Sequence, residues 1–116
     1  MQRRSFLAAS AAAIAAPAVL AQNGKLTPLK FTLDFRINGQ TAPFFLALAK
    51  GYYRDEGLDV SIDTGAGSVA SITRIASGVY QLGLGDISSL VEFNAQNSGT
   101  PVVQAVYQYY NRAPFV

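Results

Sequence analysis

A glycine-rich turn holds the first residues whose types and spacing could do chemistry. Residues 65–70 read GAGSVA, which fits the G-x-G-x-x-G/A pattern of a loop that opens a helix over a dinucleotide pyrophosphate. Asp86 follows about twenty residues later, where that pattern expects a ribose-binding acid. Glycine before a helix also serves other ligands, because the first-turn N–H groups bind any small anion or polar head. The glycine turn is therefore compatible with two kinds of ligand, a dinucleotide or another small solute.

The elements around this turn predict an α/β structure with a doubly wound, mostly parallel sheet. Strand and helix patterns alternate, with strands expected at 30–37, 58–63, 81–85 and 102–109 and helices at 43–50, 68–77 and 86–97. Right-handed crossovers then put helices on both faces of the sheet. The strand at 58–63 alternates apolar and polar residues, so it is expected at or near an edge. Val69, Ile72, Ala76 and Val79 are expected to form the buried stripe of the helix at 68–77.

Three helix starts should meet where the strands end. In an open α/β sheet the carboxyl ends of the strands face one crevice, and ligands bind there. The starts are residues 41–44, with Thr41 as the expected N-cap, residues 67–69, and residues 86–88. Each alone is explained by an ordinary cap or turn, and Asp86 as a helix cap is as good an interpretation as Asp86 as a ligand. Their convergence predicts a site before it predicts a ligand.

The strand before the glycine turn argues against the dinucleotide interpretation. A dinucleotide loop normally follows a central strand that is apolar on both faces, whereas residues 58–63 read LDVSID, with three polar residues. The turn is also the second strand-to-helix connection of the domain. An exported Rossmann-like oxidoreductase domain that uses Gly65–Ala70 is kept as the alternative hypothesis.

Residues 1–21 have the features of an export signal. Arg3 and Arg4 precede a mildly apolar stretch and small residues that end at Ala21, so we expect cleavage after Ala21 and a periplasmic protein. The twin-arginine and general export routes both stay open. Residues 22–29 are a polar lead-in. Without Arg3 and Arg4 the nine basic residues become seven, equal to the seven acidic ones, so no basic patch for nucleic acid is predicted.

Two longer runs of sequence resemble a known family. The runs are LDFRINGQTAPFFLALAKGYYRDEGLDVSI at 33–62 and GAGSVASITRIASGVYQLGLGD at 65–86. They resemble the solute-binding proteins of ABC importers in the nitrate, sulfonate, taurine and thiamine-pyrimidine-precursor group. The resemblance implies a type II periplasmic binding protein, in which two α/β lobes close on a solute. Residues 30–116 would be part of lobe one, and the chain, which stops at NRAPFV after an apolar run, is expected to be a fragment that folds poorly alone.

The resemblance also implies which residues face the solute. Phe35 looks like the family's aromatic residue at the end of the first strand, although its alternation with Phe31 and Leu33 favours a core position. Arg36 could pair with an anion, but a lone arginine after a strand is more often solvated. Tyr109, like Tyr107, falls where a fourth strand reaches the cleft. The predicted ligand-binding set is Phe35, Gln40, Thr41, Pro43, Phe44, Gly67, Ser68, Val69, Asp86, Ile87, Ser88 and Tyr107.

Binding is predicted in place of catalysis. A eukaryotic branch of the resembled family makes the thiamine pyrimidine in what resembles a single-turnover process, with an active-site histidine and iron near a cysteine-rich motif. This sequence contains no histidine and no cysteine, so no catalytic residue, cofactor, metal site or disulfide is expected. The expected partners are a small solute (sulfonate, carboxylate or pyrimidine-like) and the permease and ATPase subunits of an importer, with the chain as a monomer.

Overall fold

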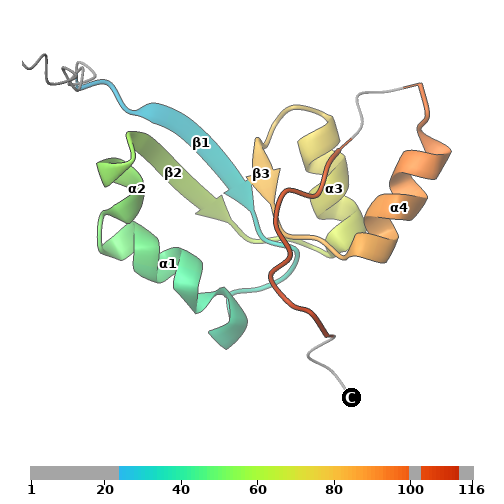
Figure 1. The fold of residues 1–116 in the computed structure, drawn as a ribbon, viewed down its shortest axis with the longest axis horizontal. Coiled ribbons are helices and arrows are strands. Elements are labelled where there is room, and N and C mark those ends of the chain that lie inside the picture. The colour runs from blue at the N-terminus through green and yellow to red at the C-terminus, as the bar shows by residue number, and fades with distance from the viewer. Residues whose placement is uncertain (1–23, 100–102, 113–116) are drawn as a thin grey trace, which may run out of the picture.

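In the described part of the chain, the sheet has three parallel strands. The computed structural model describes residues 24–99 and 103–112, and the predicted export signal lies outside them (Figure 1). Strands β1 (Thr27–Thr32), β2 (Leu58–Asp63) and β3 (Leu82–Gly83) pair in the order β2-β1-β3. Every second residue of β2 is half-buried and the others are exposed. The predicted α/β class, the parallel sheet and the edge position of residues 58–63 are therefore confirmed.

The helices form two groups beside the sheet. A short 3-10 helix, η1 (Gly39–Thr41), leads into α1 (Ala42–Ala49) and α2 (Tyr52–Asp55), which lie beside β2 (Figure 1). Helices α3 (Ser68–Ala76) and α4 (Ile87–Gln96) pack together beside β3. The chain crosses from β1 to β2 and then back past β1 to β3. Right-handed crossovers in opposite directions place their helices on opposite faces of a sheet.

A buried serine fastens α3 to the sheet. Ser71 is fully buried, and its hydroxyl donates a hydrogen bond to the carbonyl oxygen of Leu84. Gly83 permits this close approach, because a Cβ at that position would lie 2.6 Å from Thr32 Cγ2 and 3.0 Å from Ser71 Oγ. The sheet therefore meets α3 through small and polar side chains as well as through Ile72.

The first strand ends earlier than predicted. It spans Thr27–Thr32, where residues 30–37 were expected. Leu33 still donates its N–H to the carbonyl oxygen of Asp63, but the chain then bends across the end of β2, and the carbonyl oxygen of Phe35 accepts from Gly65 N–H. The third strand is also shorter, two residues instead of five. The pattern of apolar residues predicted that strands form in these two regions, but not the residues at which the strands end.

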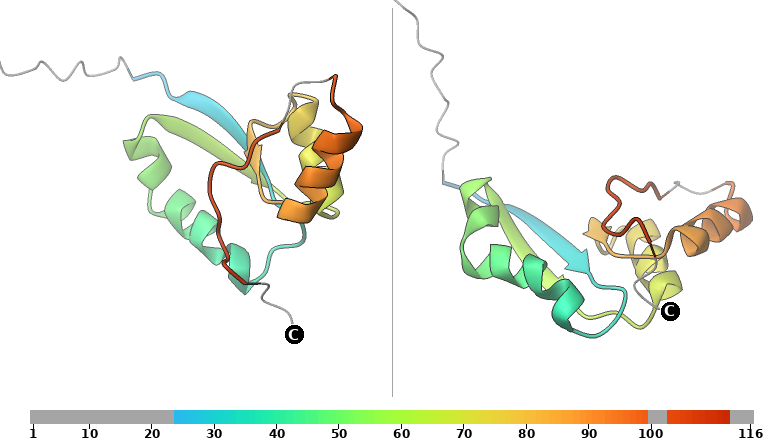
Figure 2. Two further views of the ribbon diagram at one scale, coloured as in Figure 1. Left: turned by 45° about the vertical axis from the view of Figure 1, so that its right-hand side comes forward. Right: turned by 60° about the horizontal axis from the view of Figure 1, so that its bottom comes forward.

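No strand forms in residues 103–112, which include nearly all of the fourth strand expected at 102–109. This segment passes from α4 toward α1 (Figure 2) and is tied by side chains instead of a ladder. Asn94 Nδ2 donates to the carbonyl oxygen of Val103 at 3.0 Å, and Tyr109 OH donates to that of Gln40 at 3.0 Å. Val106 is 78% exposed. The prediction of a buried strand over these residues is wrong.

The fully buried apolar core of the described residues is small. Leu33 and Ile72 are its members. Val69 and Val79, predicted to be buried with Ile72, are more than half exposed. Helix α3 turns Ser71 and Ile72 toward the sheet, and it ends at Ala76, before Val79. Across residues 24–99 and 103–112, no helix combines the length and the hydropathy needed to span a bilayer.

Candidate functional site

Three loops meet at the carboxyl edge of the sheet. The loop after β1 accepts main-chain hydrogen bonds from the loop after β2: Gly65 N–H donates to Phe35 O at 3.0 Å and Gly67 N–H to Asp34 O at 2.6 Å. The loop after β3 joins them, because Asp86 N–H donates to Ser68 Oγ at 3.0 Å. Of the three helix starts predicted to converge at this edge, these hydrogen bonds bring together those of α3 and α4.

The glycine turn lies close to the main chain of the loop after β1. A Cβ at Gly65 would lie 1.9 Å from the carbonyl oxygen of Leu33. Position 65 therefore accepts only glycine without movement of the backbone. Gly67 has φ 114°, a value that L side chains rarely adopt, and directly precedes α3. The neighbour that requires glycine at position 65 is the loop after β1, and the expected approach of this backbone to a ligand stays a prediction.

The start of α3 leaves main-chain donors free. No side chain caps this helix, and the N–H groups of Ser68, Val69 and Ala70 have no acceptor among the described residues. Val69 is 62% exposed, so solvent reaches this end of the helix. Unpaired first-turn N–H groups together with the helix dipole favour an anion or a polar head. Of the three predicted helix starts, this one has the chemistry expected of a solute site.

The start of α4 differs from that of α3 in having a side-chain cap. Asp86 is the N-cap, and its Oδ2 accepts from Ser89 N–H at 3.0 Å, which confirms the capping interpretation. Ser68 Oγ accepts from Asp86 N–H, so its own hydroxyl hydrogen remains available as a donor. Ile87 is 60% exposed and Ser88 is exposed. The predicted residues 86–88 thus lie beside Ser68, on the solvent side of the α3–α4 junction.

The start of α1 is built differently from the prediction. Thr41 is buried, and its hydroxyl accepts from Asn38 N–H at 3.1 Å and donates to Asn38 O at 2.9 Å. Asn38 Oδ1 in return accepts from Gln40 N–H and Thr41 N–H. Asn38 therefore caps η1, whereas Thr41 occupies the N-cap position of α1, as predicted, but its buried side chain makes no capping hydrogen bond to α1. The capping-box spacing of Asn38 and Thr41 was a signal that the sequence interpretation missed.

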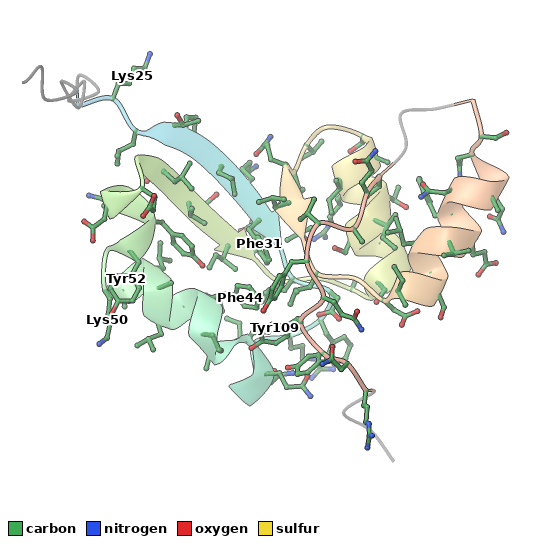
Figure 3. The ribbon with its side chains drawn as sticks, in the orientation of Figure 1. Lys25, Phe31, Phe44, Lys50, Tyr52 and Tyr109 are labelled. Atoms are coloured by element: carbon green, nitrogen blue, oxygen red, sulfur yellow. The ribbon has the colours of Figure 1, made fainter. Side chains whose placement is uncertain are left out.

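Aromatic packing occupies two more of the predicted residues. Phe44 lies between Phe31 and Tyr109, with ring centroids 5.1 and 5.4 Å away (Figure 3). Tyr109 also contacts Tyr110 at 4.4 Å. Burial raises the pKa of the Tyr110 phenol, and the nearby Tyr109 and Asp34 raise it further. Phe44 is thus part of the packing between β1, α1 and residues 103–112, and Gln40 supports it through the carbonyl oxygen that binds Tyr109 OH.

Phe35 and Tyr107 are the exposed aromatic residues of the predicted set. Phe35 is 52% exposed in the bend after β1, so the alternation that favoured a core position is wrong, because β1 has ended before it. The Arg36 guanidinium lies 5.4 Å from the Phe35 ring. Tyr107 is 81% exposed and lies on residues 103–112, which form no strand. Of these two residues, Phe35 is the one whose main chain takes part in the meeting of the loops, because its carbonyl oxygen accepts from Gly65 N–H.

A shallow apolar pocket of ≈ 690 Å³ lies elsewhere, along the outer side of α1. Of the predicted site residues it involves Pro43 alone. Its lining residues are Ile37, Asn38, Gly39, Ala42, Pro43, Phe45, Leu46 and Ala49. The pocket therefore involves neither the glycine turn nor the starts of α3 and α4.

A family model described as NMT1/THI5 like matches residues 38–116. The chain belongs to the NMT1/THI5-like family. The matched region contains η1, helices α1 to α4, strands β2 and β3 and the glycine turn. No curated protein and no solved structure matches the chain. Membership of the NMT1/THI5-like family supports a solute-binding role, either in a transporter or in the synthesis of a thiamine precursor.

In this NMT1/THI5-like chain, the glycine turn is not placed in the sheet as a dinucleotide loop is. A dinucleotide loop follows a strand at the point where the strand order reverses, whereas this turn follows the edge strand β2. Its first glycine is required by contact with Leu33. Among the described residues, no group of three or more His, Cys, Asp or Glu side chains is placed to hold a metal ion.

Proposed function

We propose that this NMT1/THI5-like chain is the solute-binding component of an ABC-type importer, which captures a small organic solute in the periplasm and delivers it to a membrane permease. The observation that carries the proposal is the family match combined with the uncapped start of α3 at the meeting point of three loops. The free N–H groups would hold an anionic or polar group of the solute. Phe35, exposed in the loop that binds the glycine turn, would contact its apolar part.

A binding role is favoured over an enzymatic one by the composition of the sequence. With no histidine and no cysteine, the sequence lacks the usual general base near neutral pH and the most reactive nucleophile. Export after cleavage at Ala21, and partnership with permease and ATPase subunits, belong to the same proposal. N-terminal sequencing of the secreted protein would test the first part, and the expected first residue is Gln22.

The binding experiment uses the full-length protein and a panel of sulfonates, carboxylates, pyrimidines and NAD(P). At least one compound of the first three classes should raise the thermal midpoint, because a ligand that binds the folded state stabilises it. A shift with NAD(P) alone would favour the dinucleotide alternative. No shift with any of the organic solutes would overturn the proposal.

A pair of variants then locates the site. Val69→Glu puts a carboxylate at the start of α3, where it competes for the free N–H groups and repels an anion, so the affinity for an anionic solute should fall at least about tenfold. Val79→Glu is the matched control, since Val79 follows the other end of α3 and is 54% exposed. Equal losses in both variants would place the solute elsewhere.

A further inference from the structure

Arg74 joins three elements through one nitrogen. It lies on α3, two turns beyond the helix start, and its Nη1 donates to Thr32 Oγ1 at 3.1 Å and to the carbonyl oxygen of Thr64 at 2.9 Å. Thr32 is the last residue of β1 and is fully buried. Thr64 is the first residue after β2 and opens the glycine turn. The guanidinium therefore links the central strand, the turn and the helix that follows it.

The surroundings of Arg74 hold the guanidinium in place. It lies 5.6 Å from the centre of the Tyr80 ring, and the Tyr80 hydroxyl donates to Asp63 Oδ2 at 2.9 Å. Lys30 Nζ also approaches the Tyr80 ring, at 5.2 Å. Cation–π contact and the nearby Asp63 carboxylate both favour a positive charge at this position. Arg74 is thus fixed between the Tyr80 ring and the two oxygen acceptors.

We propose that Arg74 is the positioning residue of the glycine turn: it fixes the main chain at Thr64 and thereby the direction in which the free N–H groups of α3 point. The turn has two further attachments, the bonds from Gly65 N–H and Gly67 N–H to the loop after β1. Arg74 adds the only side-chain hydrogen bond to the main chain of residues 64–67 among the described residues. Its importance for solute binding rests on the proposed function, whereas its hold on the turn does not.

A lysine at position 74 should not make all the hydrogen bonds that Arg74 makes. The planar guanidinium presents donors in a fixed geometry, while a lysine ammonium is a compact charge on a flexible stem. Arg74→Lys keeps the charge beside Tyr80 but should lose one or both oxygen contacts. Lys30→Met is the matched control, because it removes the other cation beside Tyr80 and leaves the bonds to Thr32 and Thr64 intact.

The test measures amide hydrogen exchange residue by residue in the full-length protein. In Arg74→Lys the amides of Gly65 and Gly67 should exchange at least about tenfold faster, while amides of the β1–β2 ladder keep their wild-type rates, because the opening is local. Lys30→Met should leave Gly65 and Gly67 unchanged. A uniform acceleration across the sheet, or none at the two glycines, would overturn the proposal.

Two further measurements separate this inference from the proposed function. Thr32→Val removes the buried acceptor and leaves Arg74 bonded to Thr64 alone. It should therefore accelerate amide exchange at Gly65 and Gly67 less than Arg74→Lys does. This variant replaces Arg74→Lys in the test if Arg74→Lys does not fold. For any solute that binds the wild type, Arg74→Lys should weaken affinity more than Lys30→Met does, and equal affinities would contradict the effect on binding. Exchange needs no solute, so a failed solute screen leaves the structural result standing.

Discussion

The backbone of Gly65 lies directly against the carbonyl group of Leu33. A Cβ at residue 65 would be 1.9 Å from that oxygen and 2.7 Å from the carbonyl carbon of Asp34. Because both neighbours are main-chain atoms at the end of the central strand, neither can move aside without disturbing the sheet. The glycine turn and the loop after β1 are therefore one structural unit, and the first prediction concerns their contact.

Gly65→Ala should destabilise the protein by about 1–3 kcal/mol or more, since a methyl group is forced into main-chain atoms. Gly39→Ala is the control, because a Cβ at Gly39 meets nothing within 4 Å and the residue lies in η1. It should be neutral or stabilising by up to about 1 kcal/mol. Urea unfolding measures both, and equal stability of the two variants would contradict the close contact.

Asn38→Ala should lower the free energy of unfolding by about 1 kcal/mol, because Asn38 Oδ1 caps η1 by accepting from Gln40 N–H and Thr41 N–H. Asn111→Ala is the matched control at an exposed asparagine and should change stability by less than about 0.5 kcal/mol. A double-mutant cycle with Thr41→Ala should show coupling, since the two side chains form one reciprocal cap. Additive effects would mean that the cap does not form.

Tyr109→Phe should cost about 0.5–1.5 kcal/mol, because it removes the hydrogen bond from Tyr109 OH to the carbonyl oxygen of Gln40 and keeps the ring that packs on Phe44. Tyr107→Phe removes a hydroxyl from a side chain that is 81% exposed and should be within about 0.5 kcal/mol of wild type. Thermal unfolding of the pair is the measurement. A larger loss of stability for Tyr107→Phe than for Tyr109→Phe would contradict the hydrogen bond between Tyr109 and Gln40.

Tyr80→Phe should change how stability depends on alkaline pH. The hydrogen bond to Asp63, more than any other cause, raises the pKa of Tyr80 above its ordinary value of 10.0. A pKa raised by folding contributes stability below the unfolded value, and this contribution disappears as pH rises through the folded value. The variant should be less stable than wild type at about pH 8, with the difference shrinking above about pH 10.

Urea unfolding across that pH range checks the Tyr80 prediction. Tyr52→Phe is the control, since the Tyr52 side chain is 53% exposed. Its difference from wild type should be small at every pH. A constant difference for Tyr80→Phe would show that the phenol and Asp63 are not coupled.

The sequence by itself determined the kinds of the main elements and their order as far as α4, but not the absence of a strand in residues 103–112. Alternation in residues 58–63 predicted an edge strand, and helical spacing with proline and glycine at the ends located α1 and α3 to within a residue or two at each end. These features depend on neighbours along the chain, so a single sequence contains them. The expected meeting of the starts of α3 and α4 followed from the topology of parallel sheets.

Only the tertiary structure decided what each polar or aromatic side chain contacts. Tyr109 binds a carbonyl oxygen 69 residues away, and Arg74 binds Thr32 across 42 residues. It also placed Ser71 and not Val69 against the sheet, and turned Thr41 inward and Phe35 outward. Periodicity reports which residues share a face, but the partner of that face is set by elements distant in sequence, and the site depends on those partners.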